Sequence, residues 1–123
     1  MIRNLLLVAL GGAIGSAGRF LCQRWFAYTW PHAFPWGTFS VNIAGCLAIG
    51  IFWGITFRHF DNNEQWKLFL MTGICGGFTT FSAFTLEGVS LIREQKMFLF
   101  FMYMAGSVLL GLLATWAGMK LVR

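Results

Sequence analysis

The chain has 123 residues, of which 58% are hydrophobic and only 11% are charged, whereas a soluble domain carries about 25% charged residues. This composition excludes an ordinary water-soluble protein and indicates an integral membrane protein. The formal net charge is +5, and nothing in the sequence predicts a nucleic-acid partner.

Long uncharged stretches predict four transmembrane helices. A helix needs about 20 residues to cross a bilayer core of about 30 Å. Pro31 and Pro35 place a turn near the start of the longest uncharged stretch. We therefore expect one all-α transmembrane domain over residues 1–123, with helices at about 3–28, 36–57, 66–92 and 97–121.

The first segment also resembles a signal peptide, because Arg3 precedes an apolar run and Ala17 and Gly18 are small. Cleavage there would leave three spans and would remove Arg19 from the mature chain. The helical pattern continues past the possible cleavage site, which favours a retained first helix.

The basic residues are divided almost evenly between the two sides of the membrane. With four spans, five of them share one side and three lie on the other, with Arg19 near the second group. This is a weak positive-inside bias, so the chain either inserts in both orientations or has a topology fixed by one end. The first group is Arg3, Arg58, Lys67, Lys120 and Arg123, and the second is Arg24, Arg93 and Lys96.

Polar and glycine residues stand at membrane depth in the second and third helices. Asn42 lies about six residues into the second helix, and Gly76 and Gly77 lie close to the middle of the third. Irregular backbone at that depth persists only where protein or a cavity satisfies it. We expect the third helix to break at this glycine pair, near the bilayer midplane, and to free carbonyls for a small hard cation such as Na+. The alternative is close glycine packing, since Gly73 and Gly77 have G-x-x-x-G spacing.

The residues after the glycine pair mix hydroxyls with phenyl rings along one helical face. Thr80, Phe84 and Glu87 follow i, i+4, i+7 spacing, and Phe81 and Phe84 are at i, i+3. Ring edges carry partial positive charge, and hydroxyls donate hydrogen bonds without a full charge, so binding stays weak enough for release. This face predicts a path for a small anion that accepts hydrogen bonds, which Asn42 would also contact. For Asn42 a simple helix–helix hydrogen bond is the alternative.

Four helices of this length cannot enclose a useful pore alone, so we expect an oligomer. If both orientations insert, an antiparallel two-fold homodimer follows, and two-fold contacts are self-complementary. The two broken third helices would then meet on the axis around one cation.

Motifs in all four predicted helices resemble the CrcB/Fluc fluoride channel family. The first is Gly11-Gly12-x-x-Gly15-x-x-x-Arg19-Phe20, and the second is Gly37-Thr38-x-x-Val41-Asn42-x-x-Gly45. The third, which is long and specific, is Gly73-x-x-Gly76-Gly77-x-Thr79-Thr80-Phe81-Ser82-x-Phe84, and Gly106-Ser107 fits in the fourth helix.

The resemblance implies a dual-topology homodimer in the cell inner membrane, with two fluoride pores and a structural Na+ on its axis. Such a protein exports toxic fluoride passively and is not an enzyme. The resemblance implies that Asn42 is a donor at the pore and that Phe81 and Phe84 form an aromatic box. It also implies that the carbonyls of Gly76 and Thr79 hold the Na+ and that Arg19 lies near an aqueous vestibule. Further polar members of the path are Thr80, Ser82, Thr85, Glu87, Tyr103 and Ser107; Ala83 departs from the family, where a hydroxyl is frequent.

Two other classes of membrane protein fit the size of the chain. A small dual-topology multidrug exporter needs a carboxylate in its first helix, where this chain has Arg19 and no acid. A non-transporting structural subunit would explain the glycine content but not the polar face of the third helix. Fluoride flux through the purified protein separates all three classes.

Overall fold

A computed structural model describes the chain except residues 31–32, 60, 62 and 123. The helices are α1 (Ile2–Thr29), α2 (Trp36–His59), α3 (Glu64–Lys67), η1 (Leu68–Cys75), α4 (Gly76–Phe78), α5 (Phe81–Arg93) and α6 (Met97–Leu121). The segment η1 is a π-helix, which continues α3 into α4. Pro35 directly precedes α2, whereas the predicted turn residue Pro31 and the charge of Arg123 lie outside the described residues.

These elements form four spans that are long and apolar enough to cross a membrane, namely α1, α2, the segment Glu64–Arg93 and α6. The prediction of an all-α protein with four transmembrane helices is therefore confirmed. The ends of these spans differ from the predicted ranges by at most two residues. We call the segment Glu64–Arg93 the third span.

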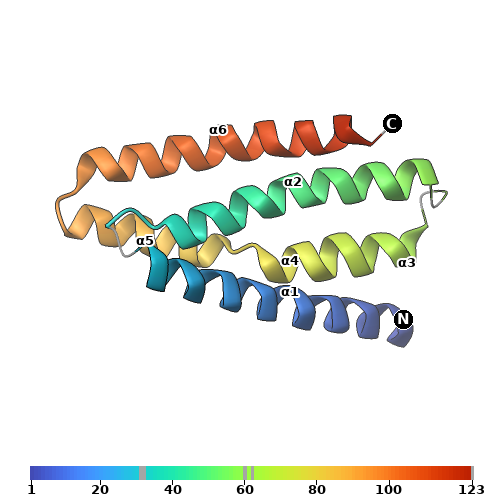
Figure 1. Ribbon diagram of the computed structural model, residues 1–123. Helices are drawn as coiled ribbons and strands as arrows, with labels where there is room; N and C mark the ends of the chain where they lie inside the picture. The colour runs from blue at the N-terminus through green and yellow to red at the C-terminus, as the bar shows by residue number, and fades with distance from the viewer. Residues whose placement is uncertain (31–32, 60, 62, 123) are drawn as a thin grey trace.

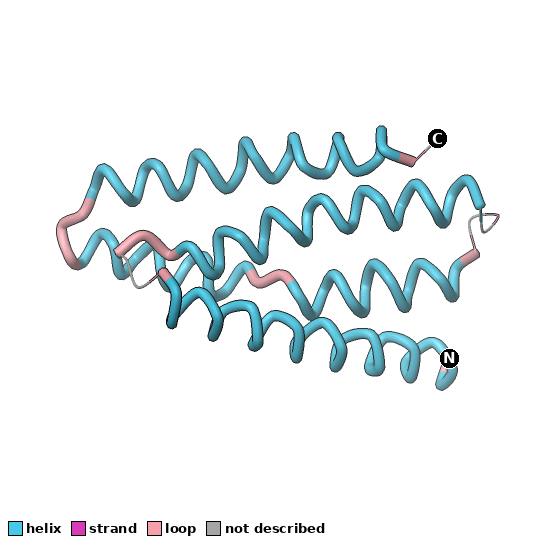
Figure 2. Tube along the Cα trace, in the orientation of Figure 1, coloured by secondary structure: helices cyan, strands magenta, loops and turns pink. Residues whose placement is uncertain are grey.

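The four spans lie side by side, and each runs opposite to the one before it in the sequence, so α2 and α6 point one way while α1 and the third span point the other (Figure 1). In this view α6, α2, the third span and α1 follow one another from top to bottom, and α2 packs mainly on α6 while α1 packs on η1 and α4. Both termini lie at the end of the bundle that also holds the connection between α2 and α3, as the tube in Figure 2 shows. The other end holds the connections from α1 to α2 and from α5 to α6.

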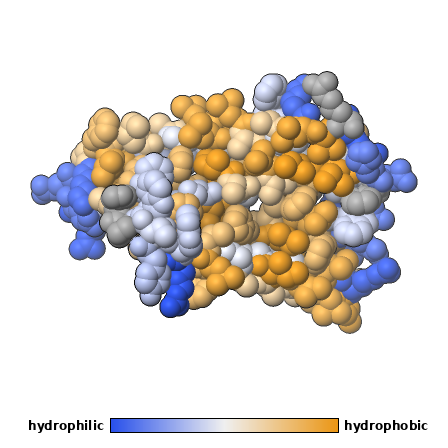
Figure 3. Space-filling model, in the orientation of Figure 1, coloured by the Kyte–Doolittle hydropathy of each residue, from blue (hydrophilic) through white to orange (hydrophobic). Residues whose placement is uncertain are grey.

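The surface of the bundle has the pattern of a membrane protein. Apolar side chains cover the middle of the molecule and polar ones gather at its two ends (Figure 3). Large apolar side chains such as Leu5, Phe98 and Leu112 are more than 60% exposed. Burial of a large apolar side chain gains about 1.5–3 kcal/mol of free energy, which each of these side chains would lose in water. A bilayer or a partner must therefore cover them.

Glycines bring α1 against the third span. Gly11 and Gly15 are buried, and a Cβ at Gly11 would lie 2.9 Å from the Cα of Gly73. A Cβ at Gly77 would lie 3.0 Å from the Cα of Gly12. The two backbones are therefore nearly in contact, and larger side chains at Gly11 or Gly77 would separate the helices.

The interruption of the third span lies at Thr79 and Thr80, and the expected break at Gly76 and Gly77 is wrong in its position. Gly76 begins α4 with right-handed helical dihedrals, whereas Thr79 (φ −88°, ψ 160°) and Thr80 (φ −149°, ψ 119°) are extended. Gly77 packs closely on Gly12 of α1, a contact that a break there would disturb. The two extended residues form the pink segment between α4 and α5 in Figure 2.

Candidate functional site

Asn42 holds the interruption of the third span by a pair of hydrogen bonds. Its amide nitrogen donates to the carbonyl of Thr80 at 3.1 Å, and its Oδ1 accepts from the backbone N–H of Thr80 at 2.9 Å. An Asn amide has two N–H donors, so one of them is not needed for this pair. Asn42 therefore makes the helix–helix hydrogen bond that was one interpretation of the sequence, and it keeps a donor for a second partner.

Thr80 caps the helix that follows. Its hydroxyl accepts a hydrogen bond from the backbone N–H of Ala83 at 3.1 Å, and its extended dihedrals are those of an N-cap residue. The Thr79 hydroxyl and the Thr79 N–H both donate to the carbonyl of Cys75, at 2.8 Å and 3.0 Å. The interruption is thus built by specific polar contacts.

These contacts deprive two carbonyls of their usual helical partners. In a continuous helix the N–H of Thr80 would donate to Gly76, and the N–H of Ala83 would donate to Thr79. Here the first donates to Asn42 and the second to the Thr80 hydroxyl. The carbonyls of Gly76 and Thr79 are therefore available to another donor or to a cation.

The carbonyl of Gly77 has a different partner. Arg19 on α1 donates to it from Nε at 3.1 Å, and the Ser16 hydroxyl lies 3.5 Å from the same oxygen. The Arg19 guanidinium is thus tied to the third span just before the interruption.

A cleft of about 380 Å³ opens beside the interruption. We call it the central cleft. Asn42 and Ser107 reach it from α2 and α6, and Phe81 and Phe84 reach it from α5. Gly76, Thr79 and Thr80 also line it. The structure therefore brings together seven of the twelve residues that the sequence singled out.

The two phenyl rings differ in their surroundings. Phe81 is 77% exposed in the single chain, while Phe84 contacts it with ring centroids 5.9 Å apart. The Phe84 ring also packs on Tyr103 of α6 at 5.0 Å, and Tyr103 packs on Phe34 at 5.4 Å. Phe84, Tyr103 and Phe34 thus form a continuous series of rings that leads away from the central cleft.

Two hydroxyls near these rings are buried without a partner. Within the described part of the chain, the Tyr103 hydroxyl and Ser107 Oγ have no hydrogen-bond partner, and Tyr103 is fully buried. They lie four residues apart on α6, and therefore on one face. A buried hydroxyl without a partner costs about 1–3 kcal/mol, and a transient acceptor would remove that cost.

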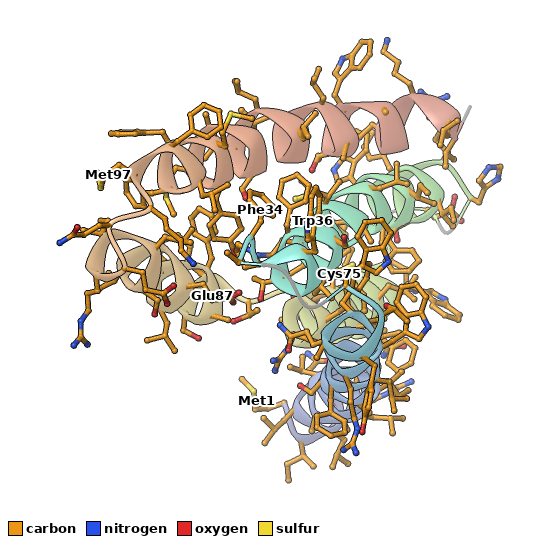
Figure 4. The ribbon with its side chains drawn as sticks, turned by 60° about the vertical axis from the view of Figure 1, so that its left-hand side comes forward. Met1, Phe34, Trp36, Cys75, Glu87 and Met97 are labelled. Carbon is orange, nitrogen blue, oxygen red and sulfur yellow. The ribbon has the colours of Figure 1, made fainter. Side chains whose placement is uncertain are left out.

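Glu87 lies in a second cavity, of about 520 Å³, with aromatic walls. Thr38 of α2 donates a hydrogen bond to Glu87 Oε1, and Gln23 of α1 donates to the Thr38 hydroxyl at 2.9 Å. Figure 4 shows Glu87 on α5 beside Phe34 and Trp36, which line the same cavity. The series of rings therefore lies between the central cleft and Glu87.

The structure leaves Ser82 and Thr85 outside both cavities. Both are exposed in the single chain; Ser82 Oγ lies 3.3 Å from the Thr80 hydroxyl, and Thr85 donates to the carbonyl of Ser82 at 2.9 Å. Ala83 contributes only its backbone N–H to the cap on Thr80.

Sequence reasoning missed the roles of Gln23 and Thr38. Thr38 is only 3% exposed and connects α1, α2 and α5. Its spacing of four residues from Asn42 was a usable signal, because it places both side chains on one face of α2. On α1, Gln23 stands four residues after Arg19, so these two side chains also lie on one face of their helix.

The described residues contain no group of three or more His, Cys, Asp or Glu side chains that could hold a metal ion.

Comparison with known proteins decides the family. A model of the family described as "CrcB-like protein, Camphor Resistance (CrcB)" matches residues 6–119. The chain belongs to this family. Its similarity to relatives in the CrcB family also extends over almost the whole length of each protein.

Relatives of this chain carry the name "Fluoride-specific ion channel FluC". The one from Rhizobium etli is 44% identical over 96% of this chain and 94% of its own length. Those from Flavobacterium psychrophilum and Leptospira interrogans are each 40% identical, over 99% and 98% of this chain and 98% and 95% of their own lengths. These names describe ion channels and not enzymes, as the resemblance implied for this chain.

Proposed function

We propose that this chain is a fluoride-selective channel that lets toxic fluoride leave the cell passively across the inner membrane. The observation that carries the proposal is the set of uncharged donors around the ring series. These are the second N–H of Asn42, Ser107 Oγ and the Tyr103 hydroxyl. Fluoride accepts hydrogen bonds more strongly than the larger halides, so donors of this kind favour it.

The proposed path leads from the central cleft past the rings to Glu87. Phe81 and Phe84 would present ring edges to the anion, since those edges carry partial positive charge. Thr80 and Ser107 would hydrogen-bond it near the cleft, and Tyr103 would do so between the cleft and Glu87. Ser82 and Thr85 join the path only where a partner covers their exposed face.

Arg19 would act beside this path as a vestibule residue. Its guanidinium carries a full positive charge, which attracts anions toward a site without binding them inside the narrow region. The hydrogen bond to the Gly77 carbonyl fixes its position close to the interruption.

A structural Na+ is the second part of the proposal. The carbonyls of Gly76 and Thr79 have lost their usual helical donors, and carbonyl oxygens are suitable ligands for a hard cation. Two carbonyls are too few ligands for Na+, so the residues fit such an ion only if a second chain adds its own pair. We therefore propose an antiparallel homodimer with the ion on its axis and two pores.

Exposure in the single chain supports an oligomer. Phe81 is 77% exposed and Gly76 is exposed too, although both line the central cleft. A second copy would close this side of the cleft and would complete both the path and the cation site.

The experiment that tests the function is release of fluoride from liposomes that contain only the purified chain. Chloride-loaded liposomes of the same preparation measure selectivity. A multidrug exporter or a structural subunit would give no fluoride release under these conditions.

A further inference from the structure

The second cavity, where the proposed anion path ends at Glu87, has aromatic walls that this path does not explain. Its walls carry four aromatic side chains and its polar side carries one carboxylate. We call it the aromatic cavity. Phe26 lies near the end of α1, and Trp30 directly follows that helix. Phe34 lies between α1 and α2, and Trp36 begins α2.

The polar side of the aromatic cavity directs its donors toward Glu87. Gln23 donates to Thr38, and Thr38 donates to Glu87 Oε1. Neither donor is a charged group, so this chain of hydrogen bonds orients the carboxylate without neutralising it. Among the described residues that line the cavity, none carries a positive charge.

The aromatic side chains form a connected wall. Trp36 contacts Phe34 with ring centroids 4.6 Å apart and Trp30 with centroids 6.2 Å apart. Trp30 and Trp36 remain 49% and 36% exposed, so the cavity is accessible from outside the chain. Its volume of about 520 Å³ lies within the range of about 300–1,000 Å³ that is usual for small-molecule sites.

Aromatic side chains together with a carboxylate that has no cationic partner among the described lining residues recognise one chemical class of ligand. A cation within about 6 Å of a ring centroid is attracted by the ring's negative face, and quaternary ammonium groups are bound in aromatic cages of this type. A small inorganic cation would keep its water and gain little from the rings. We propose that the aromatic cavity binds an organic ammonium ion, with its methyl groups against Trp36 and Phe34 and its charge toward Glu87.

Direct binding tests this inference without any dependence on fluoride transport. The full chain, purified in a maltoside detergent that lacks ammonium groups, is titrated with choline by isothermal calorimetry. The matched probe is 3,3-dimethylbutan-1-ol, which has the shape of choline with carbon in place of the charged nitrogen. We expect saturable choline binding that is at least ten-fold tighter than binding of the neutral alcohol. Equal binding of both probes, or none of choline, would overturn the proposal.

Variants locate the site. Glu87→Gln keeps the shape of the side chain and removes its charge, so we expect choline binding to weaken at least ten-fold. Glu94→Gln is the matched control, because Glu94 is an exposed carboxylate that pairs with Lys96 at 3.1 Å outside the cavity. If Glu87→Gln fails to fold, Trp36→Leu tests the aromatic wall and should weaken binding several-fold. Unchanged affinity in a folded variant of either kind would contradict the inference.

A lipid headgroup and a free ammonium ion share this chemistry, and the membrane separates them. The choline titration is repeated in vesicles of phosphatidylcholine and of phosphatidylglycerol. Weaker apparent binding of free choline in phosphatidylcholine supports a headgroup as the occupant. Equal binding in both supports a soluble ion, and no binding in either vesicle would refute the site.

Discussion

Asn42 is the residue on which the interruption of the third span depends. It satisfies both the N–H and the carbonyl of Thr80, at 2.9 Å and 3.1 Å. Asn42→Ala would leave two backbone groups without their partner, at about 1–3 kcal/mol for a buried group. We predict a loss of free energy of unfolding of that size in detergent. Thr29→Ala, which removes an exposed hydroxyl bonded within its own helix, should change it by less than about 0.5 kcal/mol; equal losses would contradict the role of Asn42.

Thr38 is the residue that connects three helices through its hydroxyl. Thr38→Val keeps the volume but removes the donor to Glu87 and the acceptor for Gln23. We expect a loss of about 1–3 kcal/mol, because Thr38 is almost fully buried and its partners remain polar. Thr38→Ser keeps the hydroxyl and should retain most of the stability. Chemical denaturation of the two variants measures the difference, and a Ser variant as weak as the Val variant would assign the effect to packing.

At the scale of elements, the close contact between α1 and the third span can be tested with neighbouring glycines. A Cβ at Gly11 would lie 2.9 Å from the Cα of Gly73, whereas a Cβ at Gly12 would meet nothing within 4 Å. Gly11→Ala should therefore destabilise the bundle by about 1–3 kcal/mol through overpacking. Gly12→Ala should be neutral or stabilising by up to about 1 kcal/mol, since Ala favours a helix. Thermal unfolding of both proteins gives the comparison, and a similar loss in the two variants would exclude this explanation.

The spans themselves could be predicted because length and apolar composition are properties of each segment alone. The position of the interruption could not be predicted in the same way. Gly76 and Gly77 have low helix propensity, but both remain helical, and α1 lies directly against Gly77. The interruption at Thr79 and Thr80 depends on Asn42, a residue of another helix about 38 positions away. Only the capping role of Thr80 could be inferred locally, because Thr is a preferred N-cap residue whose hydroxyl accepts a hydrogen bond from a backbone N–H in the first turn of the following helix.

The candidate site was predictable to different degrees. The central cleft joins residues from three predicted helices, and seven of its residues were predicted as site residues from the sequence. The aromatic cavity was not predicted, because its aromatic side chains come from two different helices and from residues between them, and which of these lie together depends on how the helices pack. Exposed positions such as Ser82 and Thr85 take their surroundings from whatever covers them, which a single chain does not supply.

At the scale of the whole molecule, the proposed Na+ and the proposed dimer depend on each other. Each chain offers the Gly76 and Thr79 carbonyls. In a two-fold dimer, the four oxygens related by the axis would surround one ion that lies on it. We predict that replacing Na+ by N-methyl-D-glucamine in all buffers lowers the dimer fraction or the fluoride flux at least several-fold. Size-exclusion chromatography with light scattering measures the first and an electrode the second. A dimer that is indifferent to this replacement in both measurements would leave these carbonyls without a cation.

We propose that this chain alone conducts fluoride along the face of Phe81 and Phe84. The direct measurement is fluoride release from liposomes that contain the purified chain, recorded with a fluoride electrode. We predict rapid release of fluoride, retention of chloride, and at least ten-fold slower fluoride release with Phe81→Ile or Phe84→Ile in otherwise intact protein. Intact protein that releases no fluoride, or that releases chloride equally well, would show that this chain is not a fluoride-selective channel.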